Sequence, residues 1–298
     1  MTLPVEKHYV VIINPSAGGG RAIKLLPEVE RQLDARRMIF RVEKTRSMEH
    51  GVDLALDAIE GREIPVVMSG DGLVGAVGGA MAGVDCPLGV IPAGRGNDLA
   101  RGLGIPDDPA AAVACLDAGF ERLIDVGEAN GERYLGVASV GFDSEANRRA
   151  NDAKLFKGQL VYFYAALRTL LTWKPERFAL IENGKQSRYT GYTIAVANNG
   201  YYGGGMNVAP HAELSDGRLD VIVVGDTPKF RFLMNLPKVF KGTHVNIEEV
   251  DEWQTTSIEI RASQPLVVYA DGDPLTELPA TVRVLPSALS VIVPGNGS

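Results

Sequence analysis

Three glycine-rich segments carry the residues whose types and spacing suggest chemistry. Asp71 stands between Gly70 and Gly72, directly after the apolar run VVMS. The segments NPSAGGG (14–20) and PAGRGND (92–98) also follow apolar runs that predict strands. Backbone N–H groups in such loops, together with the N-terminus of a following helix, favour phosphate groups. Three such loops with one carboxylate among them predict a phosphate site more strongly than a set of plain tight turns.

The alternative to a general phosphate site is a dinucleotide-binding site. Residues 70–75 fit the GxGxxG pattern of dinucleotide-binding proteins. Such sites usually have an acidic residue at the end of the next strand, where it holds the ribose. The next predicted strand ends in IPAGRGN without an acid, and the Walker A pattern is absent. A dinucleotide-dependent oxidoreductase is therefore disfavoured.

The periodicity of apolar residues predicts the elements that position these loops. Strands and helices alternate, which predicts a parallel sheet with helices on its faces and a ligand site beyond the carboxyl ends of the strands. Pro27 predicts a break or a fresh start in the first helix. Strands are expected at 9–15, 38–45, 64–70 and 87–94, and helices around 23–33 and at 47–61, 73–83, 97–105 and 108–119.

From about residue 125 the pattern changes to short β-rich runs separated by turn signals, with a hairpin turn at ENGK (182–185). This predicts a mostly antiparallel second domain, interrupted by helices at 157–173 and 228–242. We expect an α/β domain over 1–125, which the C-terminal segment 286–298 could complete, and a β-rich domain over 126–285.

Composition limits the function classes. The chain has 298 residues, 45% hydrophobic and 22% charged, which suits two domains with buried cores. A net charge of −7 argues against a nucleic-acid partner. Cys86 and Cys115 lie in apolar surroundings and are expected to be reduced thiols. No leader peptide or membrane-spanning run is recognisable, so a cytoplasmic protein is expected. The oligomeric state is not indicated.

In their order along the chain, the segments INPSAGGG, SGDGLVGAVGGAMAG and LGVIPAGRGNDLARGLGIP resemble the diacylglycerol kinase catalytic-domain family, which includes bacterial lipid kinases and sphingosine kinases. The segments VGFDSEA, ANNGYYGGGMNVAPHAELSDGRLDVIVV, FKGTH and VYADGDPL follow in family order, so the resemblance covers nearly the whole chain. It implies an N-terminal NAD-kinase-like α/β domain and a C-terminal antiparallel β-sandwich domain.

The resemblance also implies a function. A lipid kinase of this family would transfer the γ-phosphate of ATP, with Mg²⁺, to the hydroxyl of a lipid such as diacylglycerol, in lipid metabolism and phospholipid biosynthesis. Its partners would be ATP, the lipid and, transiently, a membrane surface at which it acts as a peripheral protein. The sequence does not identify the lipid.

The family's functional residues can be placed on matching positions. Asp71 would act near the phosphates of Mg–ATP. Asp273, in a DGD sequence that matches the family's DGE, would be the catalytic base, unless it is only a β-turn residue. The side chain of Asp216 and the backbone carbonyls of Glu213 and Arg218 would hold a structural Mg²⁺, unless this segment is a plain Asp-Gly turn. The implied nucleotide-binding residues are Asn14, Gly18, Gly19, Thr45, Gly70, Asp71, Gly72, Leu73, Gly94, Arg95, Gly96, Asn97 and Arg101.

The nucleotide loops depart from the family pattern. Leu73 and Arg95 stand where the family has threonines, Ala76 stands where it has a glutamate, and Ser69 and Gly75 replace a glycine and an asparagine. Arg95 could contact phosphate or could fill the site by pairing with Asp71. These departures keep a second hypothesis open, a catalytically weak or inactive relative that binds lipid or nucleotide as a sensor or carrier.

Two segments could face lipid. The predicted helix at 157–173 has an apolar stripe, and the segment FRFLMNLPKVFKG (230–242) offers a similar case. Apolar stripes at helical spacing usually belong to a core. The alternatives are the wall of an acyl-chain pocket or a lip that faces the bilayer.

Overall fold

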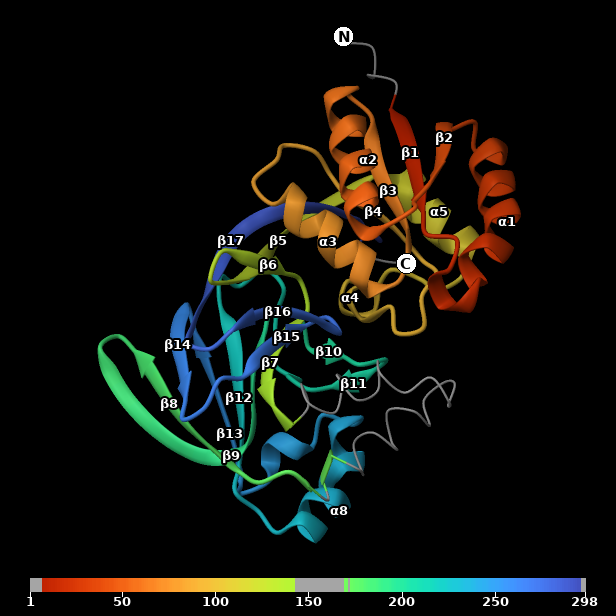
Figure 1. The fold of residues 1–298 in the computed structure, drawn as a ribbon. Helices are drawn as coiled ribbons and strands as arrows, with labels where there is room; N and C mark the ends of the chain where they lie inside the picture. Colours follow the sequence, from red (N-terminus) through yellow and green to blue (C-terminus); the bar gives the residue numbers. More distant parts are fainter. Residues whose placement is uncertain (1–6, 143–168, 171, 296–298) are drawn as a thin grey trace. The chain divides into compact units, whose positions relative to one another are not determined.

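The computed structural model describes residues 7–142, 169–170 and 172–295 (Figure 1). These residues divide into two compact units. The first unit comprises the chain up to Val126 together with the segment from Pro286, and the second comprises Gly127–Leu285. The chain passes between the units within two strands, β5 (Phe120–Ala129) and β17 (Ala280–Val293).

A parallel sheet with the strand order β2-β1-β3-β4 forms the centre of the first unit. Its strands are β1 (His8–Ile13), β2 (Ile39–Lys44), β3 (Ile64–Ser69) and β4 (Gly89–Pro92). In β1 and β3 five consecutive residues are buried, as expected for strands covered on both faces. The chain leaves β1 toward β2 on one side and leaves β3 toward β4 on the other. The carboxyl ends of β1 and β3 therefore form a topological switch point, where ligands of such sheets bind.

Helices cover both faces of this sheet (Figure 1). Helix α1 (Arg21–Ala35) packs beside α5 (Pro109–Ala118), and α2 (Met48–Glu60) packs beside α3 (Asp71–Met81). Short helical turns follow β1 and β4, namely η1 (Ala17–Gly19) and α4 (Asp98–Gly102). This arrangement confirms the predicted α/β fold of the N-terminal part.

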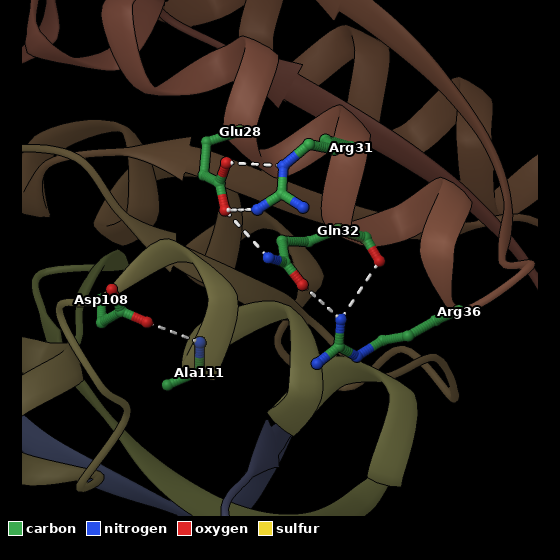
Figure 2. Close-up of polar contacts among 6 residues, drawn as sticks. All are labelled: Glu28, Arg31, Gln32, Arg36, Asp108 and Ala111. Atoms are coloured by element: carbon green, nitrogen blue, oxygen red, sulfur yellow. Dashed lines mark hydrogen bonds and ion pairs between the residues drawn. The ribbon is translucent and has the colours of Figure 1, made fainter.

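Polar contacts along α1 and at the start of α5 are shown in Figure 2. On α1, Glu28 pairs with Arg31 at 2.6 Å, and the side-chain carbonyl of Gln32 accepts a hydrogen bond from Arg36 at 2.6 Å. The Asp108 carboxylate caps α5 by accepting a backbone N–H three residues on, at 2.9 Å. Contacts at this spacing stabilise a helix surface modestly, whereas the cap fixes where α5 begins.

The break predicted at Pro27 is wrong, because α1 runs through it without interruption. Proline removes one backbone hydrogen bond from a helix interior. The apolar face of α1 compensates for this loss, since Leu26, Val29 and Leu33 are buried against the sheet. Burial of an amphipathic face generally outweighs local propensity in a folded domain.

The end of the chain belongs to the first unit. Val291 forms an isolated parallel bridge with Leu88, and the Ile292 N–H donates to the Leu88 carbonyl at 2.9 Å. Ile292 lies in the same core cluster as the strands β1 and β3. The C-terminal residues therefore help to close the core of the first unit.

The second unit is an antiparallel β structure. Besides β5 and β17 it contains β6 (Glu132–Tyr134), β7 (Val137–Gly141), β8 (Glu176–Glu182), β9 (Lys185–Ala197), β12 (Leu219–Gly225), β13 (Val250–Thr255), β14 (Ser257–Ala262), β15 (Val267–Ala270) and β16 (Asp273–Glu277). The strand order is β16-β15-β7-β9-β8-β14-β17-β5-β6, and β12 pairs with β9 and with β13. The long strand β9 pairs with β8 along its first half and with β7 and β12 along its second half.

Shorter elements complete the second unit. A two-stranded ladder joins β10 (Tyr201–Tyr202) to β11 (Met206–Asn207), and α8 (Lys229–Val239) precedes η2 (His244–Asn246). At the β8–β9 hairpin, Asn183 and Gly184 have φ values of +51° and +76°, which matches the turn predicted there. The antiparallel fold class is confirmed. The helix expected at 157–173 falls almost entirely outside the described residues.

No helix in the described ranges combines the length and the hydropathy that crossing a bilayer requires.

Candidate functional site

Three loops leave the carboxyl ends of β1, β3 and β4, which are neighbouring strands. We call them the glycine loops: residues 14–20, 70–72 and 93–97. They are the segments singled out from the sequence, and they meet at the switch point of the sheet.

The glycine loops touch one another through backbone atoms. A Cβ on Gly70 would lie 3.0 Å from the Gly94 Cα, and a Cβ on Gly94 would overlap the Gly70 backbone. Gly18 has φ +61°, and a Cβ there would lie 2.6 Å from the Ala93 carbonyl oxygen. Side chains at these three positions would push the loops apart. Glycine is therefore required here by the packing of the loops, before any ligand is considered.

The two helices that start beside the switch point lack side-chain caps. The N-cap residues of α1 and α3 are Gly20 and Gly70, which offer no capping group. By contrast, Ser47 caps α2 and Asp108 caps α5. The first N–H groups of a helix have no partner within it, and the helix dipole makes this end positive. The starts of α1 and α3 are thus suited to an anion.

Asp71 is the first residue of α3 and lies against the start of α4. Its Oδ1 accepts a hydrogen bond from the Leu99 backbone N–H at 3.2 Å. Burial, and then the neighbouring Asp98 carboxylate, raise the pKa of the Asp71 carboxyl. Two carboxylates that share a partly buried place favour a proton or a cation between them.

The side chains of Asn14 and Asn97, both predicted to contact the nucleotide, form hydrogen bonds with other groups of the protein. Asn14 Oδ1 accepts the backbone N–H of Ser16 at 3.1 Å. Asn97, with φ +53°, accepts the Gly94 N–H through Oδ1 at 2.9 Å and donates through Nδ2 to Asp107 at 2.9 Å. Both asparagines therefore shape the loops, and Asp107 is a supporting residue that the sequence reading missed.

Two arginines lie at the glycine loops. Arg21 Nη1 donates to the Gly94 carbonyl at 3.2 Å, which ties the start of α1 to the third loop. Arg95 is exposed, and its Nη2 lies 3.5 Å from where a Cβ of Gly19 would be. Within the described part of the chain no ion pair joins Arg95 to Asp71. Arg21 was missed from the sequence, although a cation directly after a glycine run was a usable signal.

Thr45 and Leu73 lie together over a glycine of α2. A Cβ on Gly51 would lie 2.5 Å from Leu73 Cδ1 and 3.2 Å from Thr45 Cγ2. Leu73 is only 3% exposed. Its side chain belongs to the core between α2 and α3, so only its backbone could face a ligand.

The remaining predicted residues of this group lie in or near the loops. Gly72 and Gly96 are half-buried, and Gly19 is exposed. Arg101 forms an ion pair with Asp98 across one turn of α4. Arg101 therefore also offsets the negative charge beside Asp71.

In the second unit, the DGD sequence forms a tight turn between β15 and β16. Asp271 has φ +52°, and its carboxylate accepts the backbone N–H groups of Leu135, Gly136 and Val137 at 3.2–3.3 Å. A Cβ on Gly136 would overlap the Asp271 carboxylate. Asp271 is therefore the anchor of the turn. The sequence alone does not reveal this role, because the partners of Asp271 lie more than 130 positions away.

Asp273, the predicted base, begins β16 and is exposed. Partial desolvation by the surrounding protein raises the pKa of its carboxyl. The two aspartates of one turn thus differ, since the first is held by backbone donors and the second is presented to solvent with increased proton affinity.

The predicted metal loop lies before β12. Asp216 accepts the Arg218 N–H at 2.9 Å and the Gln254 side-chain amide at 3.0 Å, and Glu213 is exposed. Beside this loop, the pKa of the Asp220 carboxyl is raised to about 6, first by burial and then by the negative charges of Asp216 and Glu252. This crowding of acidic groups is suited to a cation.

Two buried oxygens beside this loop lack a partner. Asp220 Oδ2 and Glu252 Oε1 have no hydrogen-bond partner in the described ranges. No group of three or more His, Cys, Asp or Glu side chains there is arranged to hold a metal ion. The expected ligand set, one carboxylate with two backbone carbonyls, does not require such a group.

Comparison with known proteins agrees with this geometry. Residues 8–129 match the family described as "Diacylglycerol kinase catalytic domain", and residues 136–293 match "YegS C-terminal NAD kinase beta sandwich-like domain". A protein named diacylglycerol kinase from Mycobacterium tuberculosis is 35% identical over 295 residues, covering 96% of this chain and 95% of that one. The chain belongs to the diacylglycerol kinase catalytic-domain family.

Two further proteins with diacylglycerol kinase in their names or descriptions are similar to this chain. A protein named diacylglycerol kinase from Bacillus subtilis is 26% identical over 78% of each chain. A crystal structure described as a diacylglycerol kinase from Bacillus anthracis superposes with a TM-score of 0.76, covering 98% of both chains at 20% identity. That structure supports the fold alone.

Within the diacylglycerol kinase family pattern, the departure at Leu73 has a local explanation. The larger apolar side chain is accommodated because position 51 of α2 has no Cβ. The lost hydroxyl is thus replaced by a core contact. The Arg95 departure differs, because that side chain is exposed beside Gly19.

We predict that Gly51→Ala lowers the free energy of unfolding by about 1–2 kcal/mol, because overpacking against Leu73 exceeds the gain in helix propensity. In a Leu73→Ala background the same change is expected to raise it by about 0.5–1 kcal/mol. Urea unfolding of the four proteins measures this coupling. Equal effects of Gly51→Ala in both backgrounds would show that Leu73 does not fill the space over Gly51.

We predict that Asp271→Ala lowers the free energy of unfolding by about 2–5 kcal/mol, because three backbone N–H groups lose a charged acceptor. Asp273→Ala, the matched control two residues away, is expected to change it by less than about 1 kcal/mol, since that side chain is exposed. Denaturant unfolding of both variants provides the comparison. A loss at Asp273 as large as that at Asp271 would contradict the assigned division of roles.

Proposed function

We propose that this protein is a lipid kinase that transfers the γ-phosphate of ATP to the hydroxyl of a lipid such as diacylglycerol. The observation that carries the proposal is the pair of uncapped helix starts, α1 and α3, which flank the glycine loops with Asp71 beside them. Family membership supports the reaction class, and the names of relatives support a lipid acceptor.

The first unit fits the phosphates of a nucleotide. The contacts of Gly18, Gly70 and Gly94 keep side chains away from the place where the loops meet. The first-turn N–H groups of α1 and α3 would donate to phosphate oxygens, and exposed Arg95 would add a cation. Asp71 would hold the nucleotide's magnesium, because its position near Asp98 favours a cation.

Phosphoryl transfer depends mainly on positioning and on neutralising charge. Bound Mg–ATP supplies the phosphoryl group and the metal's charge. Asp273 would accept the proton of the attacking lipid hydroxyl, and its raised pKa makes it a stronger base than an ordinary aspartate. Asp271 supports this role by fixing the turn that carries Asp273.

A second magnesium site would be structural. Asp216 and the backbone carbonyls of Glu213 and Arg218 would provide its protein ligands, with water completing an oxygen shell. The partnerless oxygens of Asp220 and Glu252 support a cation near this loop.

A binding-only relative that acts as a sensor or carrier is the second candidate. The observation that favours it is Ala76, which provides no carboxylate on α3 where the family pattern has a glutamate. The two candidates differ in turnover, not in fold.

We predict that Asp273→Asn reduces lipid phosphorylation at least about 100-fold, because an amide cannot accept the hydroxyl proton. Purified protein is incubated with γ-labelled ATP, Mg²⁺ and a lipid extract in micelles, and labelled lipids are separated. The control is Glu277→Gln, an exposed acid at the other end of β16, which is expected to retain activity. Wild-type activity in Asp273→Asn would remove the base assignment. A folded wild-type protein that labels no lipid would favour the binding-only candidate.

We predict that Arg95→Ala weakens Mg–ATP binding by about 3–10-fold, and more strongly at low salt, because an exposed cation beside phosphate is screened by ions. Isothermal titration calorimetry measures the affinity, with Lys24→Ala on the exposed side of α1 as the control. Tighter binding by Arg95→Ala would mean that the arginine obstructs the site.

We predict that Mg²⁺ raises the melting temperature of the wild-type protein by on the order of 2–4 °C relative to chelator, and that Asp216→Ala removes this gain. Asp251→Ala, an exposed acid on β13, should keep it. Differential scanning fluorimetry at fixed ionic strength makes the comparison. An unchanged magnesium effect in Asp216→Ala would exclude this loop as the site.

A further inference from the structure

Helix α8 exposes large apolar side chains. Phe230 is 75% and Met234 61% exposed, and Phe240, just beyond the helix, is 54% exposed. No residue of α8 is buried. Phe230 and Met234 are four positions apart and therefore share one helix face. Apolar side chains gathered in this way on a surface usually mark an interaction site.

The opposite face attaches α8 to the second unit. The Phe232 ring lies 4.5 Å from Tyr192 in a stacked arrangement and 4.9 Å from Phe142 at a steep angle, measured between ring centroids. Leu233 packs on the same cluster. Because this face is held by aromatic contacts, Phe230 and Met234 are directed outward, and α8 lies at one end of the strands of this unit (Figure 1).

The charge of the segment is opposite to that of the chain. Residues 229–241 contain four basic and no acidic residues, whereas the whole chain has a net charge of −7. Arg231 is already paired with Glu249 at 2.5 Å. Lys238 and Lys241 are exposed and form no ion pair within the described ranges. They remain to attract an anionic surface.

We propose that α8 and the turn after it, residues 229–241, dock this protein on the surface of an anionic bilayer. A short helix with aromatic and methionine side chains outward and lysines beside them matches an interfacial helix that lies in the headgroup plane. The lysines attract anionic headgroups, while Phe230 and Met234 enter the boundary with the acyl chains. The inference goes beyond lipid phosphorylation and does not depend on it, since it concerns binding without nucleotide.

The test is sedimentation of the full-length protein with vesicles, without ATP. Vesicles of phosphatidylcholine are compared with vesicles that contain about 30 mol% phosphatidylglycerol, which gives their surface a negative potential. Wild-type protein is expected to bind the anionic vesicles, and to lose most of this binding at about 1 M salt. Lys238→Ala/Lys241→Ala should weaken partitioning roughly 30-fold, about fivefold for each lysine. Phe230→Ser/Met234→Ser should weaken it about tenfold or more.

Matched controls separate this surface from general charge and hydrophobicity. Lys24→Ala/Lys185→Ala removes two exposed lysines elsewhere, and Leu123→Ser removes an apolar side chain that is 55% exposed. Both should bind like wild type, and circular dichroism melting verifies that every variant is folded. Wild-type binding by both α8 variants, or equal losses in the controls, would overturn the proposal. Sedimentation equilibrium provides a further check: an α8-dependent dimer that binds no vesicles would assign the surface to a second copy of this chain instead.

Discussion

The backbone contact between Gly70 and Gly94 is the constraint on which the candidate phosphate site depends. The loops after β3 and β4 can approach this closely only because neither residue has a Cβ. Their approach lets Asp71 reach the start of α4, and the third loop in turn contacts Gly18. A side chain at any of these glycines would separate the loops and move the starts of α1 and α3. The chemistry proposed for this place is therefore a consequence of how closely three backbones pack.

In the second unit a glycine also allows a close contact that fixes a turn, but here the contact is made by a carboxylate and not by backbone atoms. Asp271 is held by three N–H groups of one segment, and this is possible only because Gly136 leaves room for it. The rigid turn then presents Asp273. Catalytic groups work best when supporting contacts fix their position. One short motif thus contains both the support and the group that we propose as the base.

Much of the fold and of the candidate site could be predicted from the sequence, because these features follow from local sequence patterns. Apolar periodicity predicted β1 to β4, the helices between them and most strands of the second unit, but not β5 or β13. Glycine spacing predicted which loops would meet beyond the sheet. What could not be predicted depends on contacts between distant residues. The unbroken course of α1 through Pro27 follows from the burial of its apolar face, the place of Leu73 follows from Gly51, and the role of Asp271 follows from a segment far away in the chain.

The most direct test of the proposed phosphate site is hydrogen–deuterium exchange of the first unit's backbone with and without Mg²⁺ and a non-hydrolysable ATP analogue. The analogue is held at a saturating concentration fixed beforehand by calorimetry. We expect slower exchange in peptides that cover residues 14–23, 69–74 and 93–99, with little change in α5. Saturated binding without protection of these peptides, or with protection confined to other parts of the chain, would contradict the claim that the glycine loops and the starts of α1 and α3 hold the phosphates.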